Sequence, residues 1–372
     1  MLLAVIAAGF VVTPEPLWAM LFYLGVLLPW LWHSVARRHQ PPRLSMAGPG
    51  ELAGVALIGW FTLTTLWDHA AGPQLGAHLI WLWNGLNTLA FFLVAAAVLR
   101  APASRERLTD LLIGFGLLNI ASAVLHLLVV GGVAELRMNG WAETRHPILG
   151  AAMIGLCVIL AAARLLQRRQ VWMSGAMLLA GMAFILATGS RGPLFAVLGG
   201  LAVLLLGQHR RLLAAAGGLT ALLLVAGFAV PGAAQLVQER LLARGWSNRL
   251  DIWRLAVAEI GRRPLFGYGP SARLDRAVDN FPHDLFLSTL FYSGAVGLLL
   301  LLLLFAAAAR AAWRARGGDR WTLLALLANT LLNGVSDLSQ VTKGPSPMWY
   351  IFWLPVVLAL SRERQPPGSQ TT

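Results

Sequence analysis

Apolar segments follow one another along almost the entire chain, separated by short polar loops. Hydrophobic residues make up 58% of the 372 residues and charged residues only 12%, which excludes a soluble globular domain. About 20 apolar residues cross a bilayer as a helix, and irregular backbone cannot face lipid. The sequence therefore predicts an all-α polytopic membrane protein with about 12 transmembrane helices. The first segment, residues 1–12, is short for a full crossing, so a re-entrant segment is the alternative there.

Arginine is concentrated in every second loop. One set of loops, with the carboxyl tail, holds 17 basic and five acidic residues, whereas the other set holds 12 basic and 11 acidic residues. Because basic loops remain on the cytoplasmic side, this asymmetry predicts that both termini are cytoplasmic. The same distribution accounts for the net charge of +13 without a nucleic-acid partner. The first segment also lacks the basic start and the cleavage site of a signal peptide.

One long hydrophilic insertion interrupts the apolar pattern. We expect transmembrane spans 1–9 in residues 1–230, a periplasmic insertion with amphipathic helices in residues 231–282, spans 10–12 in residues 283–361, and a disordered cytoplasmic tail in residues 362–372. The insertion is rich in arginine and ends at a histidine that opens the next apolar segment. Any chemistry is therefore expected at this outer side of the membrane.

Arg191 is the informative charge among the apolar segments. Residues 192–207 provide 16 residues, about 24 Å of helix, which is short of a full crossing. We therefore expect Arg191 to be recessed in protein below the outer surface, where a permanent cation requires a fixed anion. An arginine that snorkels or anchors the helix at the interface is the alternative.

Within the insertion, a helical stripe begins at Arg249 and continues with Trp253, Ala256, Val257 and Ile260. This spacing predicts an amphipathic helix along the membrane surface. Arg262 and Arg263 end that helix, where a cation also complements the helix dipole, so a structural role explains one of them as well as ligand binding does. Residues 265–270 then predict a glycine-rich turn that can approach another group closely, with a plain loop as the alternative.

His283 lies between a proline and a long apolar segment, so we expect it in the first turn of span 10. The positive end of a helix disfavours imidazolium, which favours a neutral base at pH 7. The other seven histidines are expected to be polar residues at the membrane interface. Several arginines with one neutral histidine suit a substrate with a diphosphate leaving group, because guanidinium groups bind phosphate oxygens and imidazole deprotonates a hydroxyl.

The sequence gives no indication of a metal site. It contains no Asp-x-Asp motif, and Arg273 and Arg276 interleave with Asp275 and Asp279. The sole cysteine, Cys157, lies inside an apolar segment, where it fits core packing better than chemistry. We therefore expect neither a metal ion nor a cofactor.

Four motifs together resemble the O-antigen ligase/O-antigen polymerase superfamily, which are bacterial inner-membrane glycosyltransferases of the GT-C type. They are Thr-Gly-Ser-Arg-Gly at residues 188–192, Ser-Asn-Arg-Leu-Asp-Ile-Trp at 247–253, Arg-Pro-Leu-Phe-Gly-Tyr-Gly-Pro at 263–270 and His-Asp-Leu-Phe-Leu at 283–287. The resemblance covers residues 188–297, and the layout of 12 spans agrees over the whole chain. It is closest to the lipid A-core:surface polymer ligases.

The resemblance implies a metal-independent enzyme of lipopolysaccharide biosynthesis, with its active site facing the periplasm. Its donor is a glycan on undecaprenyl diphosphate, a membrane lipid, and its acceptor is a sugar hydroxyl of lipid A-core. Carried over by motif, Arg191 and Arg249 hold the donor diphosphate or glycan, and His283 is the general base. Arg263 is a further candidate for the diphosphate, and Asp337 is a candidate for orienting a partner or binding the acceptor. Inverting transfer by direct attack of the acceptor hydroxyl is the hypothesised mechanism.

Two departures and three alternatives accompany this interpretation. Family members commonly have His-Asn where this chain has His283 and Asp284, and the insertion of roughly 50 residues is compact. A polymerase of the same superfamily shares the donor chemistry and differs only in its acceptor. A protein O-oligosaccharyltransferase and a flippase for lipid-linked glycans are further alternatives, although a flippase predicts polar residues lining the membrane centre.

Overall fold

The computed structural model describes residues 1–13, 15–36, 48–68, 75–130, 138–211, 249–274 and 281–361, and regular structure in these ranges is helical, without a strand. The elements are α1 (Leu2–Ala8), α2 (Glu15–Phe22), η1 (Tyr23–Leu27), α3 (Leu28–Ala36), α4 (Pro49–Leu63), η2 (Thr64–Trp67), α5 (Leu75–Val98), α6 (Pro102–Val130), η4 (Ala142–Thr144), α7 (Pro147–Leu166), α8 (Val171–Ala187), α9 (Arg191–Gln208), α12 (Arg249–Arg262), α13 (Leu285–Arg314), α14 (Gly317–Asp337), η6 (Trp349–Trp353) and α15 (Leu354–Leu360). The prediction of an all-helical chain is confirmed for the described residues.

Five of these helical segments are long and apolar enough to cross a membrane, namely α4 with η2, α5, α6, α7 and α13. Shorter apolar helices occupy most of the other expected spans, namely the run from α2 to α3, α8, α9, and η6 with α15. Together they indicate a multi-pass membrane protein. The count of 12 stays a prediction, because span 9 at residues 212–230, residues 231–248 and the tail at 362–372 lie outside the described residues.

The first segment forms only a short helix. Its helix α1 has seven residues, about 10 Å of helix, and most of them are buried. Trp18 packs over this helix, and its indole nitrogen donates to the carbonyl of Val5 at 2.8 Å. The hydroxyl of Tyr350 donates to the carbonyl of Ile6 at 2.6 Å. These contacts hold α1 inside the bundle and agree with the re-entrant alternative.

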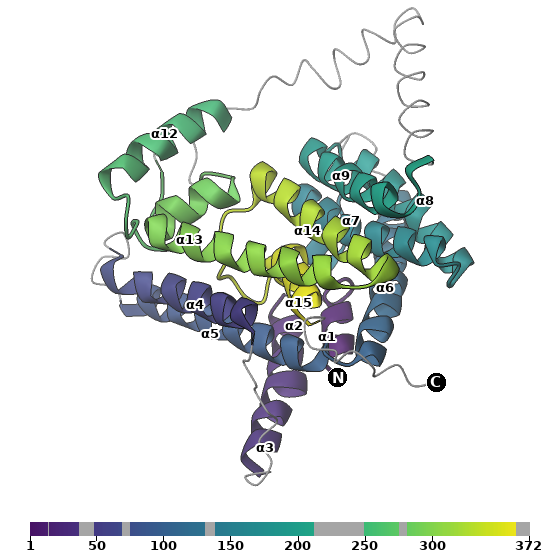
Figure 1. Ribbon diagram of the computed structural model, residues 1–372, viewed down its shortest axis with the longest axis horizontal. Coiled ribbons are helices and arrows are strands. Elements are labelled where there is room, and N and C mark those ends of the chain that lie inside the picture. Colours follow the sequence, from purple (N-terminus) through teal and green to yellow (C-terminus); the bar gives the residue numbers. More distant parts are fainter. Residues whose placement is uncertain are drawn as a thin grey trace, which may run out of the picture.

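Helix α7 forms the centre of the bundle, and 83% of the residues in its most apolar stretch are buried. Helices α8, α9, α14 and α6 all contact α7, so the apolar surface of α7 packs mainly against other helices. Figure 1 shows α13 between α4 and α14, with α9, α7 and α8 beyond α14. Gly200 lets α9 approach α14, because a Cβ there would lie 3.0 Å from the carbonyl oxygen of Ala325.

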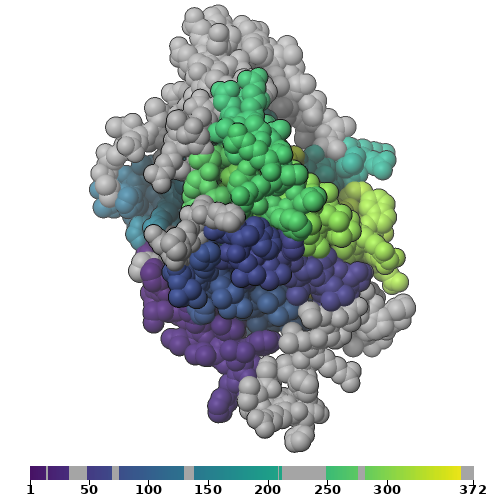
Figure 2. Space-filling view, turned by 90° about the vertical axis from the view of Figure 1, so that its left-hand side faces the viewer, coloured from purple at the N-terminus to yellow at the C-terminus, as the bar shows by residue number. Residues whose placement is uncertain are grey.

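Helix α14 connects the two ends of the bundle. Its 21 residues span about 30 Å, the thickness of a hydrocarbon core. We call the end of the bundle at the start of α14 the inner end, and the end at Asp337 the outer end. Figure 2 views the molecule from the side on which α12 lies, and the green residues that include α12 rest against the blue α4.

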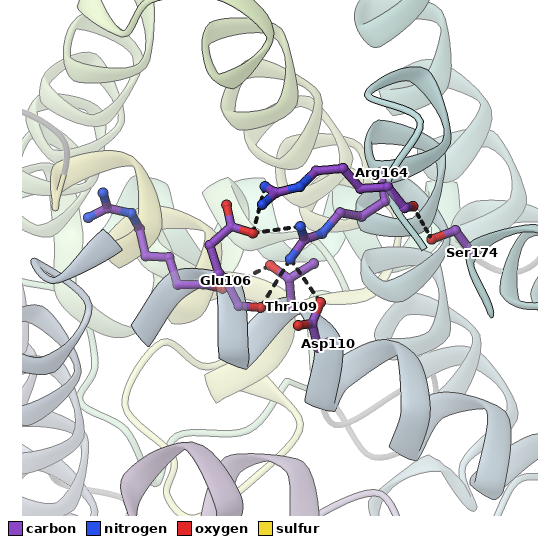
Figure 3. Close-up of polar contacts among 7 residues, drawn as sticks. Glu106, Thr109, Asp110, Arg164 and Ser174 are labelled. Atoms are coloured by element: carbon purple, nitrogen blue, oxygen red, sulfur yellow. Dashed lines mark hydrogen bonds and ion pairs between the residues drawn. The ribbon is translucent and has the colours of Figure 1, made fainter. Parts of the chain in front are cut away.

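At the inner end, Arg164 of α7 is held by two carboxylates of α6 (Figure 3). Its guanidinium lies 2.5 Å from Glu106 and 2.8 Å from Asp110, and its side chain is only 7% exposed. Glu106 also pairs with the more exposed Arg169 at 2.9 Å. Because a buried cation is stable only when paired, this cluster fastens α6 to α7.

Candidate functional site

His283 and Asp337 meet at the outer end of the bundle. Nδ1 of the His283 imidazole lies 2.6 Å from Oδ1 of Asp337, the last residue of α14. The His283 side chain is 30% exposed, whereas that of Asp337 is 9% exposed. Because a carboxylate only accepts hydrogen bonds, Nδ1 donates to Asp337, and in the neutral form of the imidazole Nε2 then keeps a lone pair. The pair therefore has the arrangement of a general base that a carboxylate orients.

The backbone at His283 is held in an unusual conformation. Its φ is 51°, in the left-handed region that costs energy for residues other than glycine. Asp284 caps α13 by accepting hydrogen bonds from the amides of Phe286 and Leu287 at 2.9 and 2.8 Å. The expected place of His283 in the first helical turn is therefore wrong, since aspartate is a strong N-cap and α13 begins after it. Burial raises the pKa of Asp284, and the two amide hydrogen bonds oppose that rise.

Arg249 approaches the same carboxylate from α12. One guanidinium nitrogen lies 3.9 Å from Oδ1 of Asp337, which is an ion pair without a hydrogen bond. The Arg249 side chain is 32% exposed, so a part of it remains open to a ligand. Arg249 and His283 thus meet at one carboxylate from two different elements.

The predicted helix at residues 249–260 is present as α12. Its buried positions include Ile252 and Ala256, whereas Val257 is 57% exposed, and the orientation of the stripe toward the membrane surface stays a prediction. Helix α12 packs on α13 with Ile252 and Ala256 inward, which turns Val257 away from the bundle. Trp253 lies beside the packed face, and its indole nitrogen donates to the carbonyl of Pro282 at 3.1 Å. This bond connects α12 to the residue directly before His283.

Arg191 is the first residue of α9, which begins beside the last turn of α14. A Cβ on Gly192 would lie 2.6 Å from the hydroxyl oxygen of Ser336, the residue before Asp337. Arg191 therefore lies at the same end of α14 as His283. The expectation of an arginine enclosed in protein is wrong, because Arg191 is exposed. Side chains tilt toward the N-terminus of a helix, so the first residue extends beyond the helix end.

Arg263 lies elsewhere at the outer end. It follows α12, whose 14 residues span about 20 Å, so Arg249 and Arg263 lie at opposite ends of that helix. Arg263 borders an apolar groove of about 640 Å³, whose other lining residues are Trp60, Trp67, Pro264, Leu265, Phe266 and Gly267. The two arginines are therefore separated by the length of α12. A role of Arg263 in holding the diphosphate stays a prediction.

The expected absence of a metal ion and of a cofactor stays untested. In the part of the chain that the structure describes, no three His, Cys, Asp or Glu side chains gather closely enough to hold a metal ion. Asp275, Arg276 and Asp279 lie outside the described residues. Cys157 is buried in the middle of α7, as its apolar surroundings in the sequence predict.

The sequence did not reveal two features of this end. The first is the hydrogen bond of Trp253 to the residue before His283, since the sequence places Trp253 only on a helical stripe. The second is a break in α13 at Gly294, where φ is 67° and ψ is −169°. A glycine inside a long apolar run was the available signal for this break, but such glycines are also common in unbroken membrane helices.

Comparison with known proteins gives two matches. A sequence model of the O-antigen ligase family matches residues 176–302, which include Arg191, Arg249 and His283. The chain is also 28% identical over 358 residues to an O-antigen ligase of Pseudomonas aeruginosa, covering 91% of this chain and 83% of that protein. Both findings support the O-antigen ligase superfamily, and the resemblance that the four motifs indicate is confirmed.

Proposed function

Since the chain resembles the O-antigen ligases, we propose that it moves a glycan from undecaprenyl diphosphate to a sugar hydroxyl of lipid A-core. The reaction takes place at the periplasmic face of the bacterial inner membrane, as a late step of lipopolysaccharide biosynthesis. The fold is of the GT-C type, and transfer proceeds with inversion and without a metal ion.

The contact between His283 and Asp337, with Arg249 beside it, is the observation that carries this proposal. A neutral imidazole whose Nδ1 donates to a carboxylate presents Nε2 as a base. Cations next to that base suit an anionic leaving group better than a neutral one. The loop arginines favour the cytoplasm for the inner end, so the outer end faces the periplasm.

The chemistry follows from these positions. Nε2 of His283 takes the proton from the acceptor hydroxyl while the hydroxyl oxygen attacks the anomeric carbon of the donor glycan. The bond from that carbon to the diphosphate oxygen breaks, and the electron pair leaves with undecaprenyl diphosphate. Asp337 keeps the imidazole oriented and stabilises the imidazolium that forms. Direct attack from the side opposite the leaving group inverts the anomeric centre.

The arginines stabilise the departing diphosphate. Guanidinium groups bind phosphate oxygens through two parallel hydrogen bonds, and they stabilise charge that develops during departure. Arg191 and Arg249 approach from α9 and α12, so a diphosphate between the two helices lies beside His283. The prenyl chain continues from the diphosphate into the outer leaflet, where the apolar groove beside Arg263 is one available surface.

A polymerase of the same superfamily is the second candidate. The matched family and the relative are both named as O-antigen ligases, which favours a ligase, but donor chemistry is common to both activities. Both need the same base and the same cations, and they differ in whether the attacking hydroxyl belongs to lipid A-core or to another lipid-linked repeat unit. A protein acceptor or simple flipping of the lipid-linked glycan finds no comparable support.

Deletion of the gene, followed by analysis of lipopolysaccharide and of lipid-linked glycan, tests the proposal. A ligase predicts long glycan chains that accumulate on undecaprenyl diphosphate while lipid A-core stays bare. Expression of the wild-type chain restores capped lipopolysaccharide, whereas expression of His283→Ala does not. Single repeat units on lipid A-core in the deletion strain indicate a polymerase instead, and unchanged lipopolysaccharide contradicts both assignments.

A further inference from the structure

The break in α13 separates an outer segment, residues 285–293, from the longer inner part of the helix. At Gly294 the backbone leaves helical geometry, so nearby carbonyl and amide groups lose their partners within the helix. A Cβ at this position would collide with the carbonyl of Leu265. The break therefore depends on glycine both for its positive φ and for the approach of a second chain segment.

That second segment is the glycine-rich turn at residues 264–269, which we call the strap. The amides of Tyr268 and Gly269 donate to the carbonyls of Phe291 and Tyr292, each at 2.9 Å. In the opposite direction, the amide of Ala295 donates to the carbonyl of Pro264 at 2.8 Å. Main chain thus pairs with main chain across the break, and the strap supplies the partners that the helix lacks.

Two further contacts complete the junction. The indole nitrogen of Trp60, in α4, donates to the carbonyl of Ser293 at 2.8 Å. Gly267 has a φ of 68°, and a Cβ there would lie 2.6 Å from the amide nitrogen of Ser293. Removing the strap would leave several backbone groups without partners, which is costly for a helix in a membrane. The close approach that residues 265–270 predict is therefore made to α13.

The other end of the outer segment is also held by α12. Trp253 donates to the carbonyl of Pro282, and one turn earlier on the same helix Arg249 approaches Asp337. Only Arg263 separates the end of α12 from the strap. One continuous piece of chain, residues 249–269, thus contacts both ends of residues 282–293, which include His283.

We propose that α12 and the strap form a clamp that positions His283, with Trp253 and Gly294 as its positioning residues. The strained backbone of His283 lies between the two contacts, and strain of this kind persists only when neighbouring structure fixes it. Fixing both ends of residues 282–293 keeps the imidazole against Asp337 while donor and acceptor exchange. The effect of the clamp on catalysis rests on the proposed function, whereas the existence of the clamp does not.

Hydrogen exchange of the full-length protein in nanodiscs, followed by mass spectrometry, tests the clamp independently of activity. In Gly294→Ala, exchange at residues 264–269 and at residues 285–293 should rise together, by about tenfold or more for the loss of one net hydrogen bond. Exchange in α7 should stay unchanged. Gly261→Ala is the matched control, because a Cβ there meets no atom within 4 Å. A rise in only one of the two segments, or in neither, overturns the clamp.

Transfer kinetics of Trp253→Phe test the positioning role. Phenylalanine keeps an aromatic ring and removes the donor to Pro282, so kcat should fall about tenfold while KM for donor and acceptor stays within about twofold. Trp172→Phe is the control, because Trp172 is 92% exposed on α8. An unchanged kcat, or a raised KM with normal kcat, overturns the positioning role. Normal transfer by His283→Ala contradicts the proposed function instead, and the exchange experiment alone then decides on the clamp.

Discussion

The two ends of α14 use charged side chains in opposite ways. At the inner end, a buried cation, Arg164, lies among the partly exposed carboxylates of Glu106 and Asp110 (Figure 3). At the outer end, a buried carboxylate, Asp337, lies beneath two partly exposed cationic or basic groups, His283 and Arg249. Both clusters neutralise the charge that is withdrawn from water. They differ in the sign of the charged groups that remain exposed.

This difference separates a structural cluster from a candidate site. A substrate with a diphosphate is repelled by exposed carboxylates and attracted by exposed guanidinium groups. The geometry differs as well, since short ion pairs of 2.5 and 2.8 Å close the inner cluster, whereas Arg249 stays 3.9 Å from Asp337. We therefore expect changes at the outer end to alter rates, and changes at the inner end to alter stability.

The largest effect is expected from His283→Ala. Loss of the general base should lower kcat for glycan transfer about 1,000-fold, within the usual contribution of such a group, and should leave the unfolding temperature close to wild type. The measurement is transfer by purified protein with a lipid-linked donor and lipid A-core. His126→Ala, at an exposed histidine of α6, is the control and should keep wild-type activity. Equal rates for the two variants would remove His283 from the mechanism.

Arg191→Lys should have the next largest effect. Lysine keeps the charge but loses the planar pair of donors, so kcat/KM for the donor should fall about a hundredfold. Steady-state kinetics with varied donor measure this change. Arg254→Lys is the matched control, because the side chain of Arg254 is 80% exposed on α12 and should tolerate the change. If both variants lose activity equally, Arg191 has no special role in binding the diphosphate.

Arg164→Ala should lower stability and leave the rate of transfer unchanged. It removes the cation that two carboxylates share, and we expect about 2 kcal/mol less stability, a discounted value because both carboxylates are partly exposed. The unfolding temperature in detergent should fall by a few degrees, with normal kcat for the folded enzyme. Arg169→Ala, at a side chain 53% exposed, should change stability by less than about 0.5 kcal/mol. Loss of kcat without loss of stability in Arg164→Ala would break the contrast between the two ends.

Asp284→Asn should have the smallest effect. Asparagine caps helices as well as aspartate does, so stability should stay within about 0.5 kcal/mol and transfer should stay normal. Burial raises the pKa of Asp284, so the folded state holds this proton more tightly, and the contribution of Asp284 to stability falls as pH rises. Relative to wild type, Asp284→Asn should therefore gain stability from about pH 4 upward. Unfolding at pH 4 and pH 7 measures the difference, and a loss in Asp284→Asn at pH 7 would contradict this assignment.

The same cap explains why the departure from His-Asn is tolerable. Asp284 uses one carboxylate oxygen as the acceptor for two amides, and an asparagine side chain offers the same acceptor. In the structure, Asp284 starts α13, which leaves His283 outside the helix.

Much of the fold could be predicted because it depends on local sequence. Each apolar run in the described ranges forms a helix, since lipid leaves the backbone no other partner. Residues 249–260 were predicted as a helix from their spacing, but which of its faces packs against protein depends on α13, on which Ile252 and Ala256 are buried. Local sequence determines that a segment is helical, whereas the helices packed against it determine which side is buried.

The site was predictable as a set of residue types and less so as an arrangement. His283 and Asp337 are 54 positions apart, and no local pattern specifies their hydrogen bond. The strap shows the same limit, because its glycines predict a close approach but not that the partner is a break at Gly294. The separation of Arg249 from Arg263 by the whole of α12 follows only once that helix is seen as straight and continuous.

The central claim is that His283 and Asp337 act as one unit at the outer end. A double-mutant cycle of His283→Ala and Asp337→Asn, measured as kcat for transfer, tests it most directly. We predict that Asp337→Asn lowers kcat at least tenfold in the wild-type background. In the His283→Ala background, the same substitution should cause no further loss of kcat. The same fractional loss in both backgrounds would mean that the two residues act independently, and would contradict the account.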